Sequence, residues 1–90
     1  MPKIFSDQNS NLYFYIYTND HQPAHVHVYK GKKNEANIMK AKINIGTSEK
    51  RPHLVQGNTN MTNKDIIAAL KIVAKNQEIF LEKWQEIHGR

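Results

Sequence analysis

The sequence lacks cysteine and has no long apolar run. None of its 90 residues is a cysteine, which excludes disulfides, thiolate metal sites and cysteine nucleophiles. No apolar segment approaches the roughly 20 residues that a membrane-spanning helix needs. The first residues, MPKIFSDQNS, lack the apolar stretch of a secretory signal. The sequence therefore predicts no membrane contact and a cytoplasmic location.

Acidic residues are scarce relative to basic ones. The chain has 13 lysines and arginines against 8 aspartates and glutamates, which gives a net charge of +5. A basic excess of this kind attracts polyanions by long-range electrostatics and counterion release. The length and the apolar fraction of 39% suit a single folded domain over residues 1–90.

The first 60 residues are rich in strand signals. Aromatic and β-branched residues, bounded by turn residues, predict strands over residues 12–18, 25–30, 35–45 and 53–56. Residues 18–24 contain Asn, Asp and Pro and predict a loop, and residues 31–34 predict a tight turn. The alternation of apolar residues slips between Ile38 and Met39, which indicates a bulge at that point.

The last third of the chain predicts one long helix over residues 63–88. Thr62 followed by Asp65 is typical of a helix N-terminus, and Gly89 stands where a helix commonly ends. Apolar residues recur between them at 3.6-residue spacing, through Ile66, Leu70, Val73, Phe80 and Trp84. The fold class expected is α+β, a small antiparallel sheet of three to four strands packed against one long C-terminal helix.

The first two predicted strands can be paired in register. If residues 18–24 connect them, Tyr17 lies opposite His25 and Tyr15 opposite His27. The alternation of side chains then divides the hairpin into an aliphatic side, which meets the helix, and a polar aromatic side. We call the second side the Tyr/His face, made of Tyr13, Tyr15, Tyr17, His25, His27 and Tyr29.

One interpretation of this face is metal-independent chemistry on RNA. Imidazole titrates near neutrality, so His25 and His27 could act as general acid and base on an RNA backbone, with no cofactor. His21 and Asp20, in the preceding loop, would position them.

The same interpretation assigns RNA contacts to neighbouring residues. Tyr15 and Tyr17 would stack on bases, and Lys30, Lys32 and Lys33 would attract phosphates.

Two other interpretations use the same residues. His25 and His27 could chelate zinc or another divalent transition metal, with His21 or Asp20 as a third ligand. Alternatively, the Tyr/His face is a non-catalytic interface for a second copy of the chain or for a small partner protein, because tyrosine is enriched at interfaces.

Residues 19–28, NDHQPAHVHV, carry a family resemblance. The stretch resembles the "NDH-x-PPHVHV" motif of a small bacterial family, domain of unknown function 4160. Asp20, His21, Pro23, His25 and His27 match the motif, and Ala24 departs from its second proline. The resemblance implies a component of a two-gene module of the toxin–antitoxin type. It implies no particular reaction.

Overall fold

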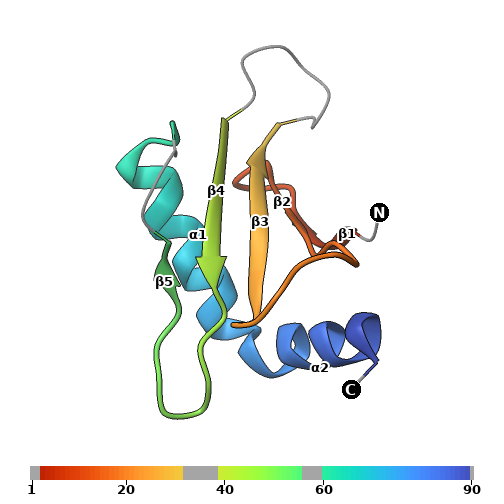
Figure 1. The fold of residues 1–90 in the computed structure, drawn as a ribbon. Coiled ribbons are helices and arrows are strands. Elements are labelled where there is room, and N and C mark those ends of the chain that lie inside the picture. Colours follow the sequence, from red (N-terminus) through yellow and green to blue (C-terminus); the bar gives the residue numbers. More distant parts are fainter. Residues whose placement is uncertain (1–2, 32–38, 56–59, 90) are drawn as a thin grey trace.

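Five strands and two helices make up the described part of the chain. The computed structural model describes residues 3–31, 39–55 and 60–89. The elements are β1 (Lys3–Asp7), β2 (Leu12–Tyr15), β3 (His25–Lys30), β4 (Met39–Asn44), β5 (His53–Leu54), α1 (Asn63–Lys75) and α2 (Gln77–His88). The strands pair antiparallel in the order of the sequence, and α1 packs across one side of the sheet (Figure 1). The α+β class is confirmed.

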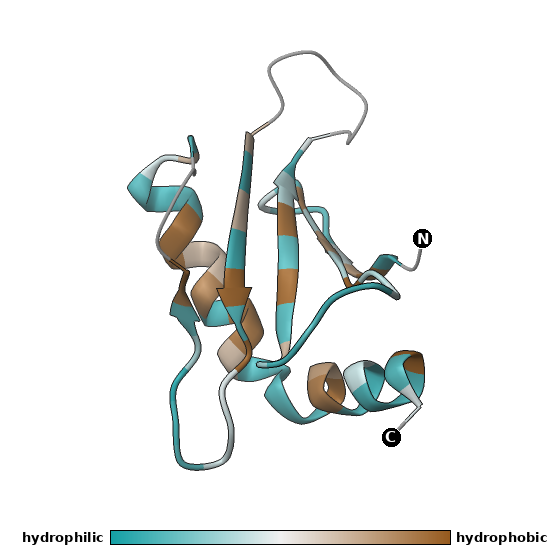
Figure 2. Ribbon diagram, viewed as in Figure 1, coloured by the Kyte–Doolittle hydropathy of each residue, from teal (hydrophilic) through white to brown (hydrophobic). Residues whose placement is uncertain are grey.

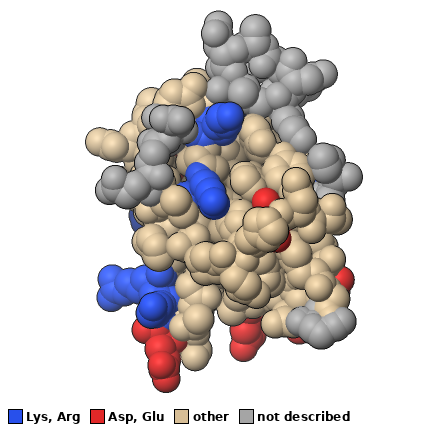
Figure 3. Space-filling view, in the orientation of Figure 1, with Lys and Arg blue, Asp and Glu red and all other residues tan. Residues whose placement is uncertain are grey.

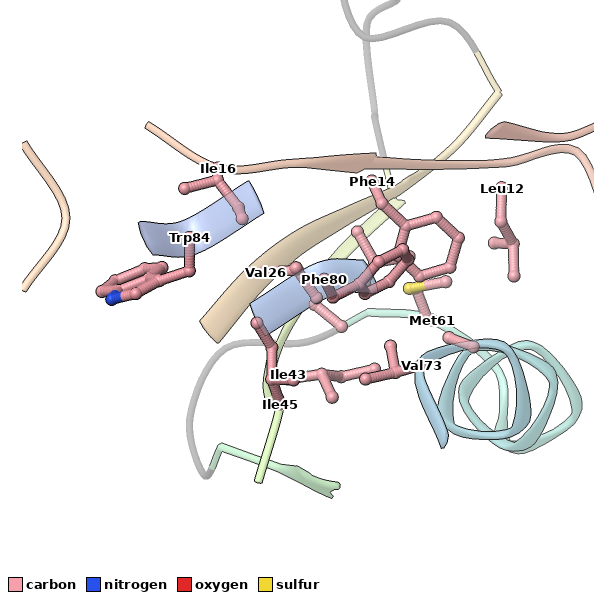
Figure 4. Close-up of a cluster of buried hydrophobic side chains, with 13 residues drawn as sticks. Leu12, Phe14, Ile16, Val26, Ile43, Ile45, Met61, Val73, Phe80 and Trp84 are labelled. Atoms are coloured by element: carbon pink, nitrogen blue, oxygen red, sulfur yellow. The ribbon is translucent and has the colours of Figure 1, made fainter. Parts of the chain in front are cut away.

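The core lies between the sheet and the helices. Apolar and polar residues alternate along β3 and β4 (Figure 2), so each strand buries one face. Val26, Val28 and Ile43 are fully buried on this face, against Ala69 and Val73 of α1. Figure 4 shows the cluster, in which the described buried residues are Leu12, Phe14, Ile16, Val26, Val28, Ala41, Ile43, Ile45, Met61, Ala69, Val73, Phe80 and Trp84.

The sheet has one strand more than the three to four that the sequence predicts. The additional strand is β1, which pairs with β2 and aligns Phe5 with Phe14. Its register shifts between Lys3 and Phe5. This irregularity breaks the two-residue alternation by which a strand is recognised in a sequence.

The predicted pairing of β2 with β3 is confirmed over most of its length. Tyr15 lies opposite His27 and Tyr13 opposite Tyr29. The expected pairing of Tyr17 with His25 is wrong, because β2 ends at Tyr15 and the chain then leaves the ladder. The predicted bulge at Ile38 and most of the predicted turn at 31–34 lie outside the described residues.

The single long helix of the prediction is wrong as well. Thr62 caps the start as expected, with its Oγ1 accepting the N–H of Asp65 at 3.2 Å. At Asn76, however, the backbone leaves helical geometry (φ −111°, ψ 22°), and α2 continues in a different direction (Figure 1). The Asn76 side chain donates to the carbonyl of Ile72 at 2.9 Å, a local bond that competes with helix continuation. Neither helix of the described ranges is long and apolar enough to cross a membrane.

Candidate functional site

Asp20 is held in place by the turn that follows β2. Its backbone N–H donates to the carbonyl of Tyr17 at 3.1 Å, and its Oδ2 accepts the N–H of Tyr17 at 2.9 Å. These reciprocal bonds close the turn and fix the carboxylate. The second oxygen, Oδ1, remains directed at the start of β3.

Two histidines of β3 meet that oxygen. The Nε2 atom of His27 lies 3.1 Å from Asp20 Oδ1, and the Nε2 atom of His25 lies 3.4 Å from it. The other ring nitrogen of His25, Nδ1, donates to the carbonyl of Pro23 at 2.9 Å. We call Asp20, His25 and His27 the Asp20 cluster. His21 is exposed in the loop and does not belong to this cluster. The sequence predicts His21 or Asp20 as the third residue beside the two histidines, and the fold brings in Asp20.

The two histidines differ in exposure. His25 is only 3% exposed, although strand alternation placed it on the solvent-facing side. The bend at Asn76 directs α2 across the end of β3, where the ring of Trp84 packs on His25 at 5.2 Å between centroids. His27 retains 25% of its side-chain exposure. A ligand in solution therefore reaches the Asp20 cluster mainly through His27.

Asp20 and His27 titrate away from their ordinary values. Burial by itself would raise the pKa of the Asp20 carboxyl, but the hydrogen bonds from Tyr17 and His27 outweigh it and hold the pKa below the usual 3.8. Burial lowers the pKa of His27 below the usual 6.5, and the carboxylate of Asp20 only partly offsets this effect. At neutral pH the pair therefore consists of an ionised carboxylate and a mainly neutral imidazole.

Two adjoining hollows flank His27. The first, of about 290 Å³, is lined by Asp20, His21, His25 and Asn44 among others. The second, also of about 290 Å³, is lined by Tyr17, His27, Tyr29, Lys40, Ala41 and Lys42. His27 and Lys42 line both, so the Asp20 cluster opens onto the Tyr/His face.

The tyrosines of this face form a connected group. The hydroxyls of Tyr17 and Tyr29 lie 2.9 Å apart, and Tyr15 meets the Tyr29 ring edge-on at 5.4 Å. Tyr17 stacks on Tyr15 at 6.1 Å and contacts the His27 ring at 4.7 Å. Of the tyrosines that the sequence singled out, Tyr17 thus contacts the Asp20 cluster directly, and Tyr15 is joined to the cluster through Tyr17.

The lysines are arranged differently from the prediction. Lys30 shares the parity of the buried valines of β3 and binds Asp65 of α1 and the carbonyl of Ser10, both at 3.0 Å, so it lies on the helix side. Lys32 and Lys33 lie outside the described residues. Lys40 and Lys42, opposite Tyr29 and His27, supply the positive charge instead.

Figure 3 views the sheet from the side opposite α1, where basic side chains lie over β4. The alternation of Lys40 and Lys42 with Ala41 and Ile43 is the signal in the sequence that could have identified them.

Comparison with protein-family models finds a match. The model of a family described as Domain of unknown function (DUF4160) matches residues 11–85, which is most of the chain. No curated protein and no solved structure matches.

Proposed function

We propose that this chain, which belongs to the family described as Domain of unknown function (DUF4160), binds single-stranded RNA through its Tyr/His face. One observation carries the proposal. Tyrosine rings, two lysines and the Asp20 cluster line two hollows that share His27 and Lys42.

The tyrosines supply surfaces for stacking. Proteins that bind single strands place successive bases on aromatic rings, because every base has a π face. Tyr15, Tyr17 and Tyr29 are partly exposed and lie in mutual contact. Such a platform suits unpaired bases, whereas the stacked bases of a duplex are not available to it.

The lysines supply the contacts to the backbone. Lys40 and Lys42 are exposed on β4. They lie opposite Tyr29 and His27 of β3, so the four side chains are on the same face of the sheet. Basic side chains beside a stacking platform hold phosphates in a way that does not depend on sequence. The net charge of +5 adds long-range attraction.

The Asp20 cluster shares its hollow with Lys42, which would hold a phosphate of the RNA. In a metal-independent reaction, neutral His27 would accept the proton of a 2′-hydroxyl, with Asp20 fixing its ring. His25 would position Asp20 and His27 and would not touch the RNA, because it is buried and its Nδ1 donates to the carbonyl of Pro23.

The RNA proposal predicts a defined loss on removing two lysines. Lys40→Ala together with Lys42→Ala is expected to weaken binding of a fluorescent single-stranded RNA, because two phosphate contacts are lost. The slope of log affinity against log salt should fall by about 0.7 for each lysine. Fluorescence anisotropy over a range of salt concentrations, with EDTA present, measures both quantities.

The matched control removes the same charge from the other side of the molecule. Lys71 and Lys75 are exposed on α1, so replacing both by alanine leaves the Tyr/His face unchanged. If this control weakens binding as much as the first pair does, net charge alone explains the affinity and the proposed face is wrong.

We further propose that the protein works in the cytoplasm as one half of a toxin–antitoxin-like pair with a small partner protein. The support is the resemblance at residues 19–28 and the tyrosine-rich face, which suits an interface as well as RNA. Co-expression with the product of the adjacent gene should give a complex of fixed stoichiometry in light scattering, and the complex should bind RNA less tightly. A chain that stays alone in that experiment contradicts the pairing.

A further inference from the structure

The Asp20 cluster brings three potential metal ligands to one point. One carboxylate oxygen of Asp20 and one nitrogen from each of His25 and His27 all lie within 4.8 Å of one another. The two distances from Asp20 Oδ1 to the imidazole nitrogens are 3.1 and 3.4 Å. Ligands that bind zinc at 2.0–2.1 Å in a tetrahedron are separated by about 3.3 Å. Two of the three ligand separations therefore already fit a bound ion.

The hydrogen bonding of His25 leaves one of its nitrogens without a hydrogen. A carbonyl oxygen can only accept, so Nδ1, 2.9 Å from the carbonyl of Pro23, carries the ring hydrogen of neutral His25. Its Nε2 then carries a lone pair and lies 3.4 Å from the carboxylate oxygen of Asp20. An ion between the two atoms could accept electron pairs from both.

The surroundings hold these ligands in place. Metal-binding histidines usually donate their other N–H to a carbonyl or carboxylate, which fixes the ring. His25 does this through Pro23 and is packed against Trp84, and Asp20 is anchored through Tyr17. Asp20 and His25 are thus held by contacts within the chain, which is the preorganisation that a metal site needs.

We propose that Asp20, His25 and His27 form a binding site for a divalent transition metal, with Asp20 Oδ1 and the two Nε2 atoms as ligands. Two imidazoles and one carboxylate suit zinc, iron or a related ion rather than magnesium or calcium, which prefer oxygen ligands alone. The remaining coordination positions face the first hollow, where His21 and Asn44 lie. The site goes beyond the proposed RNA binding and stands whether or not RNA binds.

The competing explanation is a hydrogen-bonded cluster that binds no ion. The hydrogen bond between His27 Nε2 and Asp20 Oδ1, with His25 Nε2 close to the same oxygen, would then account for the arrangement. A metal ion, in contrast, engages all three side chains at once. The two explanations differ in whether zinc binds and in which substitutions remove it.

The test is a zinc titration of the full chain, with any affinity tag removed and all metal first stripped with EDTA. Isothermal titration calorimetry and native mass spectrometry should give one zinc per chain. Asp20→Asn and His25→Gln should each weaken binding by about 100-fold or more, since losing a ligand costs at least as much as losing a residue that only orients a ligand. Asparagine keeps an oxygen for the N–H of Tyr17, and circular dichroism in EDTA verifies that both variants are folded.

The matched control is His53→Gln, which makes the same chemical change at an exposed histidine outside the Asp20 cluster. It should bind zinc as the unaltered chain does. The proposal is overturned if the folded chain binds no zinc, if His25→Gln binds as well as the unaltered chain, or if His21→Gln abolishes binding while Asp20→Asn does not. Because RNA binding is measured in EDTA, its outcome is independent of this one.

Discussion

Replacing Phe80 by alanine is expected to destabilise the protein by about 3–5 kcal/mol, the usual effect of deleting a large aromatic side chain from a core. Phe80 is fully buried on α2. Its ring lies 5.6 Å from that of Phe5 and 5.7 Å from that of Phe14, so it joins α2 to β1 and β2. Domains of this size are stable by only about 5–15 kcal/mol. The substitution therefore removes much of the free energy of unfolding. Urea denaturation followed by circular dichroism measures this change.

The neighbouring residue provides the control for Phe80. Ile79 is 50% exposed on the same helix, and Ile79→Ala should change the free energy of unfolding by no more than about 0.5 kcal/mol. Equal losses for the two variants would mean that α2 is not packed as described. A loss at Phe80 alone ties the stability of the domain to the position of α2, and hence to Trp84 and His25.

Replacing Gly46 by alanine is expected to cost about 2–4 kcal/mol. Gly46 has φ +82°, a conformation that costs an L-residue about 1–2 kcal/mol. An added Cβ would also clash with the carbonyl oxygen of Lys50 and would lie 3.0 Å from Nε2 of Gln77. That nitrogen donates to the carbonyls of Ile45 and Lys50, bonds worth about 1 kcal/mol each, and the clash would break them.

A substitution at Gly89 separates the backbone strain at Gly46 from the clash of the added Cβ. Gly89 too has a positive φ, +73°, but nothing lies within 4 Å of an added Cβ. Gly89→Ala should therefore show the backbone strain alone, about 1 kcal/mol. If Gly46→Ala costs no more than Gly89→Ala in the same denaturation experiment, the close approach of Gly46 to Lys50 and Gln77 is not important for stability.

Strand pairing was predictable because one face of each strand is buried. A slip of one residue would have moved Val26 and Val28 out of the core, so the alternation fixes Tyr15 opposite His27. The bend at Asn76 was not predictable from the same kind of signal. Apolar residues recur on both sides of Asn76 at helical spacing, and that recurrence is the same for one straight helix and for two that meet at an angle.

The candidate site was predictable in its residue types but not in its arrangement. His25 and His27 follow from the sequence, whereas the choice of Asp20 over His21 depends on how the Tyr17 N–H orients the loop. The burial of His25 depends on Trp84, which lies nearly 60 residues away in the chain and reaches it only because α2 turns. Contacts between residues this far apart in the sequence depend on how the elements pack. Local sequence patterns do not predict them.

The position of Trp84 gives the protein an optical probe of its own site. Trp84 is the only tryptophan in the chain, and its ring lies 5.2 Å from that of His25 and 4.0 Å from that of His88. All tryptophan fluorescence therefore comes from one ring in contact with the Asp20 cluster. Coordination of His25 to an ion changes the charge beside the indole and with it the emission, so binding at the site can be followed without a label.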